Sequence, residues 1–168
     1  RLHRIPLGAP PGQRLALGLE VSYVRQRDYD GRFSFLDYDV VTGFLSTYYD
    51  FGNGFHGQID TGRYLAQDWG ATFTLTRRFN NGFEVGAFFT LTEVGFDEFG
   101  EGSFDKGIAI SVPLTWMTGK PSLDRAGMTI RPILRDGGAQ LALRNRLFDL
   151  TRSERQGELD SRWGQFWR

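Results

Sequence analysis

Apolar and polar residues alternate one by one between Gly70 and Thr92. A period of two residues places successive side chains on opposite faces of a β-strand. Asn81 and Gly82 divide the segment into two runs, and an Asn-Gly pair supplies the two positive-φ residues of a type I′ turn. The segment therefore predicts an antiparallel hairpin with one apolar face, formed by Ala71, Phe73, Leu75, Phe83, Val85, Ala87, Phe89 and Leu91.

The same alternation predicts further strands at residues 14–24, 40–51, 55–65, 108–116, 128–135 and 139–148. Pro113 must lie at a strand edge, end or bulge, because proline cannot donate a ladder hydrogen bond. Residues 1–13 contain three prolines and no periodicity, so we interpret them as a lead-in or linker. Residues 14–152 carry the β-strands, and residues 153–168 form a charged tail with an aromatic end.

About eight short strands with no helical pattern predict an all-β, antiparallel protein. Tight and long connections tend to alternate, as they do in outer-membrane barrels. Two arrangements remain open, a membrane β-barrel and a soluble β-sandwich or small barrel. In a membrane barrel the apolar face of the hairpin points outward toward lipid, whereas in a soluble fold it points inward.

The composition narrows the choice of ligands. The 168 residues carry 20 basic and 20 acidic side chains, so net charge gives no reason to expect a nucleic acid. With no cysteine and two histidines, we expect no metal site and no cofactor.

No run of about eighteen apolar residues is present, which excludes a transmembrane helix. The chain begins at Arg1 without a signal peptide, so we expect either a processed chain or a fragment.

Several stretches of the chain are similar to a known family. They are YVRQRDYDGRF at 23–33, DYDVVTG at 37–43, GRYLAQDWGATFTLTRRFNNGFEVGAF at 62–88, EFGEGSFDKGI at 98–108, RDGGAQL at 135–141 and LFDLTR at 147–152. Together they resemble, in register, the YjbH family of Gram-negative outer-membrane proteins, which are encoded with genes for exopolysaccharide and capsule production.

The resemblance implies a fold, a location and partners. This chain would be the C-terminal segment of a larger outer-membrane barrel, a lipoprotein that assists export or assembly of secreted exopolysaccharide without catalysing a reaction. The implied partners are outer-membrane lipid, other proteins of the export system and the remainder of the family's chain. The resemblance implies no catalytic residues in this sequence.

A barrel with its apolar positions outward would direct charged side chains into the lumen. Arginines outnumber acids in this inward set, so we expect a positively biased wall, and planar guanidinium groups pair well with carboxylates. We hypothesise contact with an anionic exopolysaccharide. Alternatively, the arginines pair with these acids and with loop acids such as Asp136 and brace the interior. The candidates are Arg78, Arg131, Arg135, Arg144, Arg146, Glu20, Asp60 and Glu84.

The acidic loop between the hairpin and the next predicted strand is a second candidate site. It could bind calcium, but Phe99 stands where that pattern needs an oxygen ligand. It could also supply two carboxylates for glycoside hydrolysis, which requires a defined separation across a cleft. We favour a loop that folds over the barrel mouth and pairs locally. Its candidates are Glu98, Glu101, Asp105 and Lys106.

Aromatic residues near the strand ends predict girdles at the two membrane interfaces, with packing between two sheets as the alternative. These residues are Tyr48, Tyr49, Trp69, Phe79, Phe83 and Trp116. The favoured function is therefore non-catalytic support of exopolysaccharide export. The alternatives are a soluble carbohydrate-binding β-sandwich and a glycan-cleaving enzyme that uses the acidic loop.

Overall fold

The computed structural model describes residues 5–7, 14–28, 35–93, 105–120, 124–131, 138 and 140–141. The strands among these residues form one antiparallel sheet. Each strand pairs with the next along the chain, in the order β1-β2-β3-β4-β5-β6-β7-β8. The strands are β1 (Ile5–Leu7), β2 (Leu15–Arg27), β3 (Phe35–Gly52), β4 (Phe55–Arg63), β5 (Trp69–Arg78), β6 (Glu84–Thr92), β7 (Lys106–Pro113) and β8 (Arg125–Ile130). The predicted all-β, antiparallel class is confirmed.

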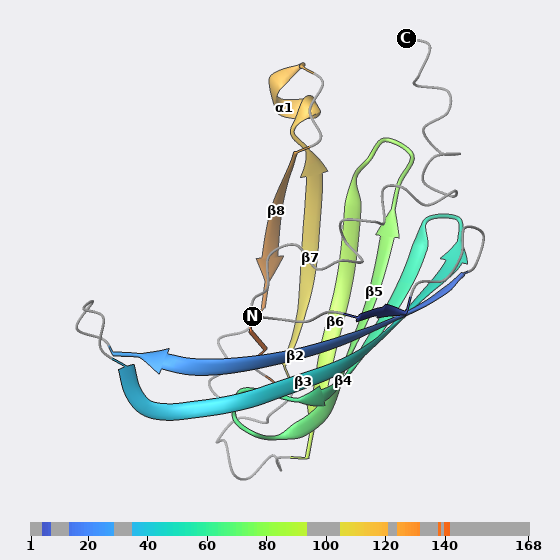
Figure 1. Cartoon of the computed structure of the whole chain (residues 1–168). Helices are drawn as coiled ribbons and strands as arrows, with labels where there is room; N and C mark the ends of the chain where they lie inside the picture. Colours follow the sequence, from blue (N-terminus) through green and yellow to red (C-terminus); the bar gives the residue numbers. More distant parts are fainter. Residues whose placement is uncertain are drawn as a thin grey trace.

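The sheet is strongly curled. In Figure 1, β2 and β3 run across the view, whereas β7 and β8 stand almost upright at the other end of the sheet. The strand order begins at β1 and ends at β8, so within the described part of the chain these two strands are edges that do not pair with each other. The described sheet is thus an open, curled half-barrel, and a closed barrel is not seen in it.

Exposed and less exposed side chains alternate along β2 and the middle of β3 and define two faces. On β3, Thr42, Phe44 and Ser46 are buried, whereas Val41 and Leu45 are exposed. A curled sheet crowds the side chains on its concave side, so we call the buried face the inner face and the other the outer face. Residues paired across the strands share a face. Register shifts in the β2–β3 and β3–β4 ladders lie close to strand ends, at Arg25/Arg27 and Asp50/Gly52.

The polarity of the two faces is opposite to that of a soluble sandwich. On the outer face of the β5–β6 hairpin, the side chains of Leu75, Phe89 and Leu91 are exposed, and those of Phe73 and Val85 are half-buried. The buried polar side chains, all on the inner face or in the loop after β4, are Glu20, Ser22, Thr42, Ser46, Asp60, Asp68, Thr72 and Thr90. Tyr48, which the sequence suggested for an interfacial girdle, is instead buried on the inner face.

The β5–β6 turn differs from the predicted type I′ turn. Gly82 has a φ of 85°, but Asn81 does not have positive φ. The Gly82 N–H donates to the Phe79 carbonyl at 2.8 Å, and the Phe79 N–H donates to the Phe83 carbonyl at 2.8 Å. This pattern belongs to a three-residue loop with a left-handed glycine. The prediction of a type I′ turn at Asn81-Gly82 was therefore wrong, although the predicted pairing of the two strands is confirmed.

The β3–β4 turn has the two-residue form instead. Gly52 and Phe55 are paired, so Asn53 and Gly54 alone make the loop. Both have positive φ, 53° and 79°, as a type I′ turn requires. The same Asn-Gly dipeptide therefore closes two hairpins of different geometry.

The remaining differences concern strand boundaries. β1 forms within the stretch interpreted as a lead-in and pairs with β2. The strand predicted to reach residue 116 ends at Pro113 and is followed by the short helix α1 (Thr115–Thr118), and β8 begins at Arg125 rather than at residue 128. The predicted strand at residues 139–148 falls almost entirely outside the described residues. No helix in the described part of the chain is long and apolar enough to cross a membrane.

Candidate functional site

A chain of hydroxyl groups crosses the inner face at the ends of β4, β5 and β6. The Tyr64 hydroxyl lies 2.6 Å from Thr72 Oγ1, which lies 2.8 Å from Thr90 Oγ1. Thr72 and Thr90 are Cα partners on neighbouring strands, so the alternation points both inward. Tyr64, directly after β4, is fully buried, and its ring packs edge-to-face on Phe44 at 5.0 Å. These contacts form an ordered polar layer inside the curl of the sheet.

Two buried carboxylates flank this hydroxyl chain. Asp60, the Cα partner of Thr72, is 2% exposed and accepts a hydrogen bond from Gln58 Nε2 at 2.7 Å. Asp68 is 4% exposed, and its backbone carbonyl accepts from the Tyr64 N–H at 2.8 Å. Burial raises the pKa of Tyr64, hydrogen bonds with Thr72 and Gln140 oppose this rise, and the charges of both aspartates add to it. The phenol is therefore protonated at neutral pH.

A segment distant in sequence contacts the same layer. The Gly138 N–H donates to Asp68 Oδ2 at 3.2 Å, and Gln140 Nε2 donates to Thr72 Oγ1 at 3.4 Å. A side chain at position 138 would lie 2.6 Å from Thr90 Cγ2, so the backbone at Gly138 approaches the sheet closely. The hydroxyl chain thus anchors a part of the protein's own chain on the inner face.

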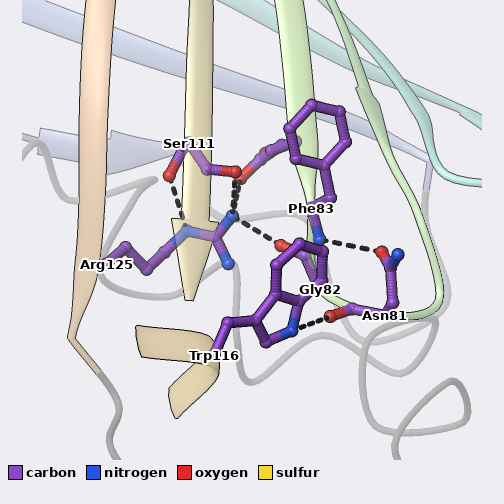
Figure 2. A network of polar contacts seen from close by, with 7 residues as sticks. Asn81, Gly82, Phe83, Ser111, Trp116 and Arg125 are labelled. Carbon is purple, nitrogen blue, oxygen red and sulfur yellow. Dashed lines mark hydrogen bonds and ion pairs between the residues drawn. The ribbon is translucent and has the colours of Figure 1, made fainter. Parts of the chain in front are cut away.

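A second polar network lies at the opposite end of the sheet, next to the tight turns. Figure 2 shows Arg125 of β8 reaching across β7 toward the β5–β6 turn. Its Nε donates to Ser111 Oγ at 2.9 Å, and its Nη2 donates to the Gly82 carbonyl at 2.7 Å. The same Nη2 lies 3.1 Å from Glu84 Oε2. One guanidinium therefore links β6, β7, β8 and a turn.

Aromatic side chains pack against one another at this end of the sheet. Trp116 of α1 stacks on Phe83 with ring centroids 6.4 Å apart, and its Nε1 donates to the Asn81 carbonyl at 3.1 Å. The Phe79 ring lies 5.6 Å from that of Phe83. Tyr49 and Phe51 of β3 form a further edge-to-face pair at 4.9 Å. We call this group, with Phe55, the turn rim.

The outer face has aromatic residues at its other end as well. Trp69 is 59% exposed at the start of β5, and Tyr23 is 63% exposed near the end of β2. Phe35, at the start of β3, has the Arg25 guanidinium 4.9 Å from its ring centroid. We call these residues the loop rim. Between the rims, the exposed large side chains are aliphatic or aromatic on β2, β5 and β6, and include Leu17, Leu19, Val21, Leu75, Phe89 and Leu91.

The structure separates the predicted lumen candidates. Arg78 and Glu84 are Cα partners at the turn rim, where Glu84 pairs with Arg125. Asp60 lies elsewhere, in the hydroxyl layer. Arg131 directly follows β8 and is exposed. The other predicted arginines, Arg135, Arg144 and Arg146, lie outside the described residues.

The acidic loop is described only at its end. Asp105 is half-buried, and Lys106 is exposed as the first residue of β7. Burial raises the pKa of Asp105, while the Arg131 charge and the Lys106 backbone N–H lower it. The charge of Arg131 therefore opposes the effect of burial on Asp105, and the pairing of lumen arginines with loop acids stays a prediction. Glu98, Glu101 and Asp136 lie outside the described residues, and within these no group of three acidic or histidine side chains could hold a metal ion.

Sequence reasoning missed several residues of both networks. Thr72 was assigned to the polar face of its strand but was not named as a candidate, although the alternation of the strand already placed its side chain on the inner face. Tyr64 and Asp68 lie in a short loop, and Arg125 was placed in a connection. Their contacts depend on strand register and on distant residues such as Gln140, which local periodicity does not report.

Comparison with known proteins places these features in a family context. Residues 7–153 match a family model, YjbH, described as "Exopolysaccharide biosynthesis protein YbjH". A curated relative, the uncharacterized lipoprotein YjbH of Escherichia coli strain K12, is 39% identical over 147 residues, which are 84% of this chain and 21% of that protein. The chain thus spans about a fifth of the length of the relative it matches. No solved structure matches the chain.

Proposed function

Since the chain belongs to the YjbH family of exopolysaccharide biosynthesis proteins, we propose that it forms part of the wall of an outer-membrane β-barrel that assists exopolysaccharide export. Its partners would be membrane lipid on the outer face, and on the edges the remainder of a longer chain and other export proteins. We propose a non-catalytic role. The E. coli relative is named a lipoprotein, which supports association with the cell envelope.

The outward apolar face is the observation that carries this proposal. Leu15, Leu17, Leu19, Val21 and Tyr23 alternate along β2 and are all exposed, from 37% to 63%. Leu15 to Tyr23 covers roughly 26 Å along the strand at about 3.3 Å per residue, the length of the shortest tilted strands, of about nine residues, that cross a bilayer. Exposing such a surface to water would be costly, whereas lipid would cover it.

The two aromatic rims support the same proposal. Aromatic rings prefer the membrane–water interface, because they combine an apolar body with a polar edge or group. The turn rim contains Phe79, Phe83 and Trp116, and the loop rim contains Trp69 and Tyr23. An apolar band between two aromatic rims is the pattern of transmembrane β-barrels.

The inner face supports a polar interior. Its buried hydroxyls and carboxylates would be poorly placed against hydrocarbon, but they suit a hydrated lumen braced by the chain itself. The alternative of a soluble carbohydrate-binding sandwich requires a second layer over the apolar face. The described residues form one sheet and supply no such layer. The glycan-cleaving alternative depends on a loop that lies mostly outside the described residues.

A matched pair of substitutions on β4 tests the proposal in the full-length protein. Ile59 faces outward, is 40% exposed and is the Cα partner of Phe73 in the middle of the outer face. Ile59→Arg should cost about 2–4 kcal/mol of stability in phospholipid vesicles, because its charge would enter hydrocarbon. The neighbouring Gln58 points inward and donates to Asp60. Gln58→Arg should cost much less, since the new guanidinium can also donate to that carboxylate.

Cells provide the functional readout. Ile59→Arg should lower the amount of protein in the outer-membrane fraction and the amount of exopolysaccharide outside the cell, and Gln58→Arg should leave both near wild type. The membrane assignment is wrong if Ile59→Arg is as stable as wild type in vesicles. The export role is wrong if exopolysaccharide release is unchanged when the protein is lost from the membrane.

A further inference from the structure

Arg77 is the charged residue of the outer face of β5, and aromatic rings hold it in place. Its guanidinium carbon lies 4.8 Å from the Phe55 ring centroid and 4.7 Å from the Phe79 ring centroid. Phe55 is its Cα partner on β4, and Phe79 lies two residues further along the chain. Contacts of this kind orient a guanidinium through its faces and leave its N–H edge available.

That N–H edge has no acceptor in the described part of the chain. The Arg77 side chain is exposed, and its described contacts are the two rings. Arg63, an outer-face arginine at the loop rim, differs in this respect. Its Nη2 donates to Gln67 Oε1 at 2.8 Å, and its Nε lies 3.4 Å from the Gln67 carbonyl. Arg77 is therefore oriented by two rings but makes no hydrogen bond within the described part of the chain, whereas Arg63 donates to Gln67.

The position of Arg77 along the strand indicates what could satisfy it. Leu75, two residues earlier on the same face, is 51% exposed and belongs to the apolar band. Phe79 belongs to the turn rim, so Arg77 lies at the boundary between the apolar band and the turns. In a bilayer this is the level of the headgroups, where the anionic acceptors are phosphates. A planar guanidinium matches phosphate with two parallel hydrogen bonds.

We propose that Arg77, held by Phe55 and Phe79, binds the phosphate of an anionic glycerophospholipid in the leaflet next to the tight turns. The inference rests on the proposed membrane-embedded function and adds a specific ligand and residues to it. The rings reduce the cost of ordering the arginine, because its guanidinium is already oriented before the lipid arrives.

The test measures lipid binding to the full-length protein in detergent by native mass spectrometry. Phosphatidylglycerol and phosphatidylcholine are titrated separately, and the dissociation constant of the first bound lipid is determined. Arg77→Gln should weaken phosphatidylglycerol binding about fivefold, the factor expected for one basic residue at an anionic surface. Phosphatidylcholine has the same phosphate but also a cationic choline group, so its binding should weaken by a smaller factor. Arg63→Gln is the matched control on the same face and should leave both lipids unchanged.

Further variants keep the test informative if Arg77→Gln does not fold. Phe79→Leu retains the arginine but removes one ring, so it should weaken phosphatidylglycerol binding in the same direction by a smaller factor. Arg77→Lys keeps the charge but loses the planar edge, and should not restore wild-type affinity. Displacement of the lipid by millimolar inorganic phosphate would overturn the assignment to a membrane lipid.

The two proposals fail in different ways. Wild-type protein that does not enter phospholipid vesicles contradicts the membrane function itself. If the wild-type protein enters vesicles normally, but the Arg77→Gln variant binds phosphatidylglycerol as tightly as wild type does, the lipid site alone is contradicted.

Discussion

Arg125 of β8 and Glu84 of β6 form an ion pair with Nη2 and Oε2 3.1 Å apart, although β7 lies between their two strands. The guanidinium spans that strand because it also donates to Ser111 Oγ on β7. Its Nη2 also donates to the Gly82 carbonyl in the β5–β6 turn at 2.7 Å and to the Ser111 carbonyl at 3.3 Å. The side chains of Arg125 and Glu84 are 28% and 14% exposed, so the pair is partly shielded from water.

Removing Arg125 should therefore cost more than removing the charge of Glu84. Arg125→Met should lower the free energy of unfolding by about 1–3 kcal/mol, because several hydrogen bonds are lost. Glu84→Gln should cost less than about 1 kcal/mol, as expected for a partly exposed ion pair. Denaturant unfolding of the full-length protein measures both, with Lys120→Met at an exposed site as the control. Equal costs would show that the ion pair, rather than the hydrogen bonds, dominates.

Gly82→Ala and Gly52→Ala compare two glycines with nearly the same backbone angle. Their φ values are 85° and 82°. A Cβ at position 82 would lie 2.7 Å from Pro113 Cγ, whereas a Cβ at position 52 would meet nothing within 4 Å. Gly52→Ala should cost about 1 kcal/mol from backbone strain, and Gly82→Ala should cost more because of the added collision. Thermal unfolding of the two variants would contradict this if they were equally stable.

Tyr64→Phe should show how much the hydroxyl chain contributes. The substitution removes the hydroxyl at 2.6 Å from Thr72 Oγ1 but keeps the ring that packs on Phe44. The expected cost is about 1 kcal/mol, since Thr72 retains Thr90 and Gln140 as partners. The backbone amide hydrogen of Gly138 should also exchange faster with solvent, because the hydroxyl chain on which Gly138 lies is weakened. Unchanged stability together with unchanged exchange would argue against a bracing role.

Asp105 should make the stability of the protein depend on pH. Burial raises its pKa above the ordinary 3.8, so between 3.8 and its folded-state pKa the folded protein binds more protons than the unfolded chain. The free energy of unfolding should fall as pH rises through that window. Asp105→Asn cannot ionise and should lack this decline, which leaves it at least as stable at pH 7. Unfolding curves between pH 3 and pH 7 measure the effect, and parallel profiles for the two proteins would contradict it.

Alternation along the sequence was sufficient to predict the class of the fold and the two faces of its strands. It correctly placed Thr72 and Thr90 on one face of the sheet and Phe73 and Phe89 on the other, because a period of two residues can be read from neighbouring positions alone. It could not distinguish the turn at Asn53-Gly54 from that at Asn81-Gly82. The dipeptide is the same, and the geometry depends on which flanking residues close the ladder, Gly52 with Phe55 or Phe79 with Phe83.

The polar networks were less predictable, because they are assembled from distant positions. Arg125 contacts Glu84 only through the register that pairs it with Pro113 on β7. Gln140 meets Thr72 across 68 residues of sequence. Arg77 was visible in the sequence as a basic residue near a turn, but its contact with the Phe55 ring requires the pairing of β4 with β5.

The strict alternation of β3 has an evolutionary consequence. Its inner side chains, such as Thr42 and Phe44, and its outer ones, such as Val41 and Leu45, depend on an unbroken count from Asp39 to Tyr49. Inserting or deleting one residue at its centre would move every later side chain of the strand to the opposite face, so that apolar side chains would point to the interior. Length variation among family members should therefore accumulate in the connections, or near the strand ends where the bulges at Arg25/Arg27 and Asp50/Gly52 already absorb a change of register.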